Sequence, residues 1–350
     1  MIKGRGAQSQ VKNRFLKHEY AQDHIEGIDE PMLENSPTRY INIYPKSIVN
    51  KVESPDVGMD YSLNPYQGCE HGCIYCYARN SHEYWGYGAG LDFERVILVK
   101  QNAAALLEKH LQNPRWVPKP IVLSGNTDCY QPVERKLKIT RSLLEIFLKY
   151  KHPVGMITKN AIVTRDLDIL GPLADQNLIS FNLSVTTLDE KVRRKLEPRT
   201  ASTKAKLAAI QKLSERGVPV YVMIGPIIPG LNDHEIPNIM EAVAEAGAYG
   251  AGYTMVRLNG AIGPIFEEWV HEAFPDKAQK ILNQIKGAHG GALNDSRFGY
   301  RMSGEGRMVE SIHRLMQLSR LKYFTGPKPP PLRTDLFVKT NKSQMGLFKA

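Results

Sequence analysis

Short apolar segments alternate with longer segments of helical periodicity through the middle of this 350-residue chain. Six apolar segments predict strands at 60–66, 120–125, 154–159, 178–185, 218–225 and 250–258, and a further strand is expected at 94–100. Apolar residues recur every three to four positions, which predicts helices, at 101–112, 139–151, 203–217 and 236–248. Because parallel strands need crossover connections, this order predicts an α/β fold with a parallel sheet, either open and doubly wound or a complete or partial barrel.

Composition divides the chain into four parts. Residues 1–57 are polar and predict an arm that wraps the surface or is partly disordered. Residues 58–262 carry the alternating pattern, 263–324 have a helical pattern, and 325–350 form a proline-rich basic tail. No segment has the length and apolarity of a membrane span, and the N-terminus lacks the apolar core of a secretory signal, so we expect a cytoplasmic protein with no membrane contact.

The net charge of +10 is concentrated at the two ends of the chain. Residues 1–20 carry five basic and one acidic side chain, and residues 320–350 carry seven basic and one acidic, so the ends account for +4 and +6. Basic ends beside a neutral middle favour a polyanionic partner, with nucleic acid first and DNA preferred. The alternative is that the ends serve only solubility.

Three cysteines, Cys69, Cys73 and Cys76, fall within eight residues with the spacing C-x3-C-x2-C. Structural disulfides are rare in the cytoplasm, so clustered thiols there indicate a metal centre. An iron–sulfur cluster with three protein ligands keeps one iron open to a substrate or cofactor. A tetrahedral zinc site instead needs a fourth ligand, from His71, His82 or Cys129.

This motif, with Tyr75 before its last cysteine and a position after the first predicted strand, resembles that of the radical S-adenosylmethionine (SAM) superfamily. The resemblance implies a partial (β/α)6 barrel of TIM type, with the N-terminal arm and a C-terminal helical extension added to it. It also implies a [4Fe–4S] cluster on the three cysteines and SAM bound to the open iron. Reduction by a donor such as flavodoxin or ferredoxin would cleave SAM to a 5′-deoxyadenosyl radical, which abstracts hydrogen from the substrate.

Residues 60–258 are further similar to the spore photoproduct lyase-like branch, also called DNA repair photolyase-like. The shared segments are "TK" at 158–159, "LSVTTLD" at 183–189, "EPRT" at 197–200 and "MIGPIIPG" at 223–230. This similarity implies a lyase-like DNA repair enzyme acting on a damaged or modified nucleic acid. Radical chemistry on a protein, RNA or a small molecule is one alternative, and a zinc-stabilised DNA adaptor without enzymatic activity is another.

The resemblance also assigns cofactor contacts to residues at the ends of predicted strands. It implies that Lys159 binds the SAM carboxylate, which suits a cationic donor, and that Ser184 contacts the ribose. Tyr75 would pack near the adenine. The backbone at Ser124 and Gly125 would line the SAM amino group. The alternatives are a solvated lysine at Lys159 and a strand-end cap at Ser184.

Further side chains remain open to more than one interpretation. The lyase has a hydrogen-returning cysteine near this region, so Cys129 is a candidate donor with Tyr130 as a relay, or else a small buried core residue. Glu197 and Arg199 would form a structural ion pair near the cofactor or touch substrate, and Arg199 is assigned to the cofactor site. Arg257 would point to the barrel mouth, where it could meet an anionic substrate.

The tail contains a possible docking motif. Gln344, Leu347 and Phe348 lie in "QMGLF", which resembles the peptide by which bacterial repair enzymes and polymerases bind the sliding clamp. The alternative is that Leu347 and Phe348 pack on the protein's own surface.

Overall fold

The structure is a computed structural model that describes residues 2–15 and 37–339, and it is built around one seven-stranded sheet. The strand order is β10-β9-β8-β7-β6-β3-β2, with β2 antiparallel to β3 and every other neighbouring pair parallel. Its strands are β2 (Val49–Lys51), β3 (Tyr61–Leu63), β6 (Ile121–Leu123), β7 (Val154–Thr158), β8 (Ile179–Ser184), β9 (Val220–Ile227) and β10 (Gly250–Met255).

The six parallel strands are those that the apolar segments predict. Buried aliphatic and aromatic residues fill them, as with Phe181 and Leu183 in β8 and Val222 in β9, because both faces of a parallel sheet are covered. The sheet ends at β10 on one side and at β2 on the other within the described ranges, so the six parallel strands form a partial barrel rather than a closed one. Their carboxyl ends meet at one edge, where the polar residues of the sequence motifs follow.

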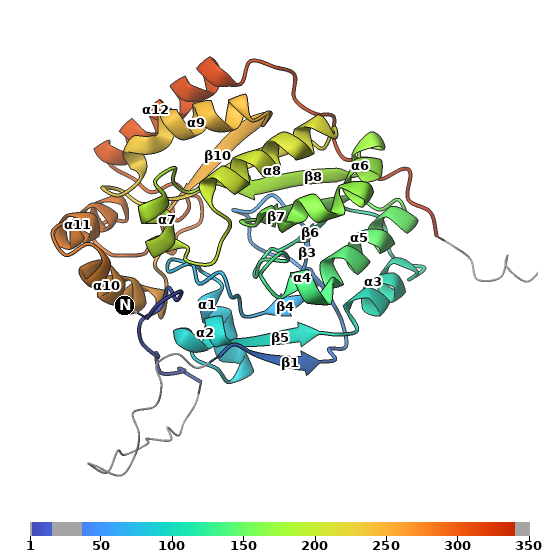
Figure 1. The fold of residues 1–350 in the computed structure, drawn as a ribbon, viewed down its shortest axis with the longest axis horizontal. Coiled ribbons are helices and arrows are strands. Elements are labelled where there is room, and N and C mark those ends of the chain that lie inside the picture. Colours follow the sequence, from blue (N-terminus) through green and yellow to red (C-terminus); the bar gives the residue numbers. More distant parts are fainter. Residues whose placement is uncertain (1, 16–36, 340–350) are drawn as a thin grey trace, which may run out of the picture.

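Helices cover the outer face of the sheet (Figure 1). The amphipathic pattern accounts for their packing: in α5 the buried residues Leu143, Leu144 and Phe147 recur at helical spacing. The covering helices are α3 (Ala103–Leu111), α4 (Glu134–Leu137), α5 (Ile139–Lys149), α6 (Leu167–Asp175), α7 (Glu190–Leu196), α8 (Thr203–Glu215) and α9 (Ile236–Glu245).

The predicted helical extension is present as α10 (Ile262–Ala273), α11 (Ala278–Ala288) and α12 (Arg307–Tyr323). Helix α12 lies along α9 and so continues the outer helical layer, whereas α10 and α11 pack against each other at one side of the molecule (Figure 1). The start of α10 is joined to α1 (Arg79–His82), because the Ala261 N–H donates to the Asn80 side chain at 3.1 Å, and α2 (Leu91–Arg95) follows α1 along the chain. A second apolar core joins these helices to the cysteine loop. None of the helices in the described ranges has the length and apolarity needed to cross a membrane.

A second, three-stranded sheet was only partly predicted. Its order is β1-β5-β4, formed by β1 (Arg39–Ile43), β5 (Val96–Lys100) and β4 (Tyr66–Gln67). β5 is the strand expected at 94–100, but the polar pattern of residues 1–57, which contain β1 and β2, predicts no strand. These strands are short, and their polar residues face solvent, so their sequence carries little periodic signal.

Candidate active site

The cysteine loop lies between β4 and α1 and brings Cys69, Cys73 and Cys76 together as free thiols. Cys69 and Cys73 are buried and Cys76 is half-buried, and burial raises the pKa of all three thiols. The loop turns at Gly68 and Gly72, with φ of +80° and +66°. A Cβ at Gly72 would lie 2.8 Å from the Glu94 carboxylate, so only glycine fits there.

A buried ion pair between Arg79 and Glu94 holds this loop from one side. The Arg79 guanidinium donates to the Cys73 carbonyl over 3.1 and 3.0 Å and contacts Glu94 at 2.5 Å. The same carboxylate accepts the backbone N–H groups of Gly6 and Ala7 at 3.0 and 2.8 Å. The N-terminal residues therefore pack directly against the cysteine loop.

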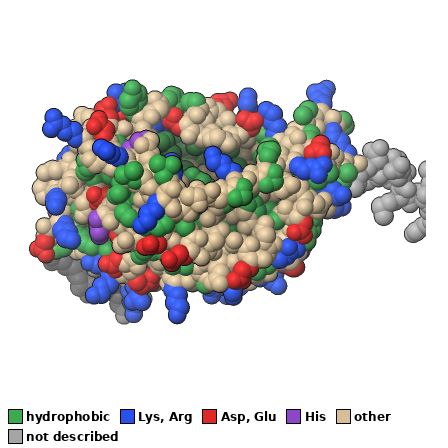
Figure 2. All heavy atoms as spheres, turned by 90° about the horizontal axis from the view of Figure 1, so that it is seen from above, with side chains coloured by type: hydrophobic (Ala, Val, Ile, Leu, Met, Phe, Trp, Pro, Cys, Tyr) green, Lys and Arg blue, Asp and Glu red, His purple; other side chains and the backbone are tan. Residues whose placement is uncertain are grey.

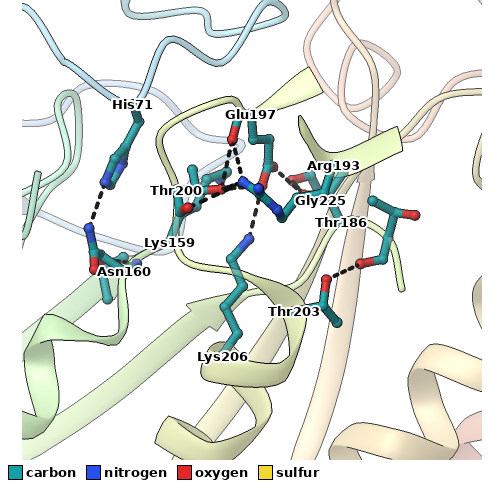
Figure 3. Close-up of polar contacts among 12 residues, drawn as sticks. His71, Lys159, Asn160, Thr186, Arg193, Glu197, Thr200, Thr203, Lys206 and Gly225 are labelled. Atoms are coloured by element: carbon teal, nitrogen blue, oxygen red, sulfur yellow. Dashed lines mark hydrogen bonds and ion pairs between the residues drawn. The ribbon is translucent and has the colours of Figure 1, made fainter. Parts of the chain in front are cut away.

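His71 holds the loop from the sheet side (Figure 3). Its imidazole lies 3.1 Å from the Asn160 amide after β7 and 3.3 Å from the Asp128 carboxylate after β6. Asp128 also accepts hydrogen bonds from the Thr158 hydroxyl at 2.7 Å and the Lys159 N–H at 2.8 Å. Burial alone would raise the pKa of Asp128, but His71 and these donors bring it below its ordinary value.

Arg199 lies on the outer side of the loop. Its guanidinium is 3.4 Å from the Glu70 carboxylate and 3.5 Å from the Thr38 hydroxyl, and its backbone N–H donates to the His71 carbonyl. Glu70 also accepts the Tyr40 hydroxyl at 2.9 Å. The ion pair of Arg199 is thus with Glu70 and not with Glu197, and its assignment to the cofactor stays a prediction.

Glu197 is the centre of a buried polar cluster (Figure 3). Its carboxylate accepts hydrogen bonds from the Tyr75 hydroxyl, from the Thr186 hydroxyl at 2.6 Å and from the Lys206 ammonium at 2.9 Å. Glu197 and Lys206 are both almost completely buried. Burial alone would raise the pKa of Glu197, but Lys206 and then Lys159 lower it to about 2. Glu197 therefore fixes the ring of Tyr75 beside the cysteines.

Lys159 and Ser184 present donors that no protein group uses within the described ranges. The Lys159 ammonium has no ion-pair partner among the residues described and lies 6.0 Å from the centre of the Tyr75 ring. Burial alone would lower the pKa of Lys159, but Glu197 and Cys73 bring it above its ordinary value. The Ser184 hydroxyl is buried at the end of β8 and is without a hydrogen-bond partner in the same part of the chain. A buried polar group without a partner is uncommon and indicates an absent ligand.

The turn after β6 places Ser124 and Gly125 at the same edge of the sheet. Ser124 has φ of +72°, and its hydroxyl accepts the Cys129 N–H at 2.6 Å, so this side chain stabilises the turn. The Gly125 carbonyl accepts the hydroxyl of Tyr77 at 2.6 Å. Tyr77 directly follows Cys76, so this part of the turn faces the end of the cysteine loop.

Cys129 and Tyr130 lie in the main apolar core rather than in the core that contains Cys73 and Tyr75. Both are fully buried, and the Tyr130 hydroxyl donates to Asp166 at 3.0 Å. These contacts are those of core residues. A role in hydrogen return stays a prediction that the contacts do not favour.

The chain belongs to the radical SAM superfamily, because the model of the Radical SAM superfamily matches residues 63–243, more than half of the chain. It is 32% identical to an uncharacterized protein of Mycobacterium tuberculosis over 234 residues, which cover 66% of this chain and 69% of that protein. It is 28% identical to an uncharacterized protein of Methanocaldococcus jannaschii over 251 residues, 71% of this chain and 89% of that one.

Among solved structures, spore photoproduct lyase has the same fold. Its complex with dinucleoside spore photoproduct matches 82% of this chain and 80% of that chain, with a TM-score of 0.59 and 16% sequence identity. A double mutant of the lyase with bound AdoMet and dinucleoside spore photoproduct gives a TM-score of 0.58 over the same shares. The predicted superfamily and its partial barrel are therefore confirmed.

Radical SAM enzymes use a [4Fe–4S] cluster and SAM, and the residues present fit both groups. The three free thiols share one loop, the unused Lys159 ammonium lies near the Tyr75 ring of that loop, and the unused Ser184 hydroxyl is at the end of β8; these donors suit a carboxylate and a ribose. No three His, Cys, Asp or Glu side chains of residues 2–15 and 37–339 are grouped closely enough to hold a single metal ion. A cluster of four irons is wider than one ion, so the thiolates that bind it stand further apart.

Three residues that hold the site were not predicted from the sequence: Arg79, Glu94 and Lys206. Arg79 and Glu94 carry no local signal, because their pairing depends on how α2 packs against the cysteine loop. Lys206 did carry one: it lies on the buried face of α8 with Ala209, Ile210 and Leu213. A lysine among apolar positions of a helix indicates a buried ion pair.

Proposed function

We propose that this radical SAM enzyme acts on nucleic acid, with a damaged or modified DNA base as its substrate. The observation that carries the proposal is the fold shared with spore photoproduct lyase over 82% of the chain, since the structures of that protein contain dinucleoside spore photoproduct. Fold alone does not transfer a substrate, so the proposal also depends on the charge of the chain and on its tail.

Some residues of the site bind the cluster, and others keep the cysteine loop in place. Cys69, Cys73 and Cys76 hold the cluster, and Arg79 and His71 keep their loop in place. When bound, the reduced cluster and SAM supply a 5′-deoxyadenosyl radical that abstracts a hydrogen atom from the substrate.

The remaining contacts are those to SAM. Lys159 binds its carboxylate, Ser184 its ribose hydroxyl and the backbone at Ser124–Gly125 its amino group, while Tyr75, held by Glu197, packs at the adenine. The apolar residues around Cys73 exclude water from this side of the site.

Charge supports an anionic partner. The excess of +10 resides in the two ends of the chain, and Figure 2 shows lysine and arginine side chains spread over the face seen from above, with acidic ones among them. A partner that contacts the basic ends is therefore more consistent with the sequence than one bound by a single basic patch. Gln344, Leu347 and Phe348, the proposed clamp-binding residues, lie outside the described residues.

Free thiols and the need for a one-electron donor favour a reducing compartment. We accordingly propose a cytoplasmic enzyme that is reduced by a flavodoxin- or ferredoxin-type protein. The zinc-stabilised adaptor is not retained, because the chain belongs to a family of enzymes.

An isomerisation is the second candidate. The chain is 24% identical, over 63% of its length and 44% of the other protein, to the Radical SAM Nalpha-GlyT isomerase of Pseudomonas phage M6. Abstraction of hydrogen by the same radical would begin a rearrangement rather than a bond cleavage. Because both reactions begin with cleavage of SAM, only the structure of the product distinguishes an isomerisation from a bond cleavage.

The test of the proposed function follows deuterium from the substrate into 5′-deoxyadenosine. The reconstituted, reduced enzyme would receive SAM and uniformly deuterated DNA, untreated or irradiated with ultraviolet light, with deuterated RNA as the matched control and Cys73→Ala as the inactive variant. We expect deuterium in 5′-deoxyadenosine with DNA and little with RNA. A DNA substrate would be rejected if 5′-deoxyadenosine contained no deuterium and if its rate of formation were the same with and without DNA.

A further inference from the structure

Arg257 lies two residues beyond the end of β10 and has an unused hydrogen-bond donor. Its Nε is buried and has no hydrogen-bond partner within the described ranges, where the one side-chain hydrogen bond of Arg257 runs from Nη1 to the Met302 sulfur at 3.9 Å. No carboxylate within ion-pair distance neutralises it among the residues described. A buried Nε–H without an acceptor is costly, so this position is consistent with a ligand that supplies one.

A second arginine adds to the positive charge. Arg301 is held by an ion pair with Asp56 and by a hydrogen bond to the Ser54 hydroxyl at 2.6 Å. Asp56 also accepts the Gly299 N–H at 2.9 Å, so this carboxylate binds both the Arg301 side chain and the backbone of the segment that carries it. Burial and the charge of Arg301 both lower the pKa of Arg257. Asp56 is thus paired with Arg301, and Arg257 has no ion-pair partner within the described ranges.

Both arginines lie near the carboxyl end of β10, because Arg257 follows this strand and Met302, the neighbour of Arg301, accepts the N–H of Met255 at its end. Tyr77, the residue after Cys76, donates its hydroxyl to the Gly125 carbonyl after β6 at 2.6 Å, so it lies at this same edge of the sheet, where Arg257 is one of its charged neighbours. Tyr77 is 55% exposed. A substrate group on Arg257 would therefore lie next to Tyr77 and within the reach of the cluster loop.

The segment around Arg301 also carries exposed aromatic rings. Phe298 and Tyr300 are 58% and 49% exposed, and the Arg301 guanidinium stacks over Phe298 with 4.3 Å to the ring centre. The segment is fixed to β10, because the Met255 N–H donates to the Met302 carbonyl at 2.9 Å. Exposed aromatic rings beside arginines are suited to stack on bases while the guanidinium groups contact phosphates.

We propose that Arg257 and Arg301 bind a phosphodiester group of the nucleic-acid substrate at the barrel mouth, beside Tyr77. This inference rests on the proposed function and names the substrate group that the mouth recognises. Guanidinium matches phosphate because its planar donors make two parallel, charge-assisted hydrogen bonds. Arg301 is positioned by Asp56 and Ser54, whereas the Nε of Arg257 has no acceptor within the described part of the chain.

The experiment measures the affinity of the reconstituted holoenzyme for a fluorescent single-stranded DNA oligonucleotide by anisotropy, over a range of salt concentrations. The variants are Arg257→Ala, Arg257→Lys and the control Arg115→Ala. Arg115 is exposed and precedes β6, at the opposite end of the strands from the mouth, and its loss changes the net charge equally. A series of otherwise identical oligonucleotides replaces one phosphodiester at a time with a neutral methylphosphonate, so that its members are positional isomers.

We expect Arg257→Ala to weaken binding by about tenfold or more, the usual effect of a hydrogen bond to a charged group. The slope of log K against log salt should fall by about one, as for the loss of one phosphate contact. Arg257→Lys should keep the slope and lose part of the affinity. The wild type should bind one methylphosphonate isomer more weakly than the diester, and Arg257→Ala should not distinguish the two.

Equal affinity and salt slope for Arg257→Ala and Arg115→Ala would overturn the inference while leaving the proposed function intact. Wild-type protein that binds no DNA, and whose SAM cleavage no DNA affects, would overturn both. A melting temperature of Arg257→Ala within a few degrees of the wild type separates lost binding from lost folding. If Arg257→Ala does not fold, an affinity of Arg257→Lys for the diester equal to that of the wild type would equally reject the site.

Discussion

The buried pair of Glu197 and Lys206 allows the most quantitative prediction. Lys206→Met removes the ammonium 2.9 Å from a carboxylate that is completely buried and close to Tyr75 and Lys159. The side chain of methionine fills a similar volume, so the main change is the loss of the charge. Removing one partner of a buried ion pair leaves the other charge uncompensated, which typically costs about 3–5 kcal/mol.

The pKa of Glu197 gives a second route to this magnitude. It falls from the ordinary value of 4.5 to about 2, a difference of about 2.5 units. At about 1.4 kcal/mol per unit, the ionised form is favoured in the folded protein by about 3 kcal/mol. Because the folded-state pKa is lowered, this contribution is fully present above pH 4.5, and it is lost as the pH falls towards 2.

We therefore expect Lys206→Met to lower the free energy of unfolding by about 3 kcal/mol at pH 7. The assay is urea-induced unfolding of the cluster-free protein, so that loss of metal does not enter the result. Lys204→Met, an exposed lysine on the same helix, is the matched control and should cost less than about 0.5 kcal/mol.

The double variant Glu197→Gln/Lys206→Met tests the reason for the loss. With both charges removed, the buried carboxylate penalty disappears, and the double variant should be more stable than Lys206→Met by about 1–2 kcal/mol. A loss below about 1 kcal/mol for Lys206→Met, or strictly additive losses in the double variant, would refute the account of Glu197 as a charge held by Lys206.

Three further predictions concern the cysteine loop and the cofactor site. Glu94→Gln should make the reconstituted cluster bleach in air at least about threefold faster, because Arg79 loses its charge partner and the N-terminal residues lose their acceptor; an unchanged rate of absorbance loss would contradict this. Ser184→Ala should weaken SAM binding by about twofold to tenfold in equilibrium dialysis, whereas Ser180→Ala on the same strand should not, and equal effects would argue against a SAM contact at Ser184. Cys129→Ser should leave formation of 5′-deoxyadenosine within about twofold of the wild type, since Cys129 lies in the main core; a drop below a tenth, in protein that melts normally, would restore it as a functional thiol.

Much of the fold followed from periodicity, which is a local property of the chain. The six parallel strands and helices such as α5 and α9 have apolar residues at regular spacing, so their type could be read from the sequence. β1 and β2 could not, because they are short edge elements whose stability comes from pairing with β5 and β3.

The site was predictable to the extent that its residues are consecutive in a motif. Cys69, Cys73 and Cys76 share one loop, so their spacing alone predicted a metal centre. Arg79, Glu94 and the N-terminal residues come from three separate segments, and their contacts depend on tertiary packing that no local pattern encodes. Glu197 was recognised as a residue near the cofactor, but its partner proved to be Lys206 rather than Arg199.

The central claim is that the three cysteines support radical SAM chemistry, and one anaerobic measurement tests it most directly. The protein would be reconstituted with iron and sulfide, reduced, and given SAM, and 5′-deoxyadenosine would be quantified by chromatography beside Cys73→Ala and the control Cys129→Ala. Brown protein that forms 5′-deoxyadenosine only when Cys73 is intact is the predicted result. Colourless protein that retains zinc and leaves SAM uncleaved would contradict the account.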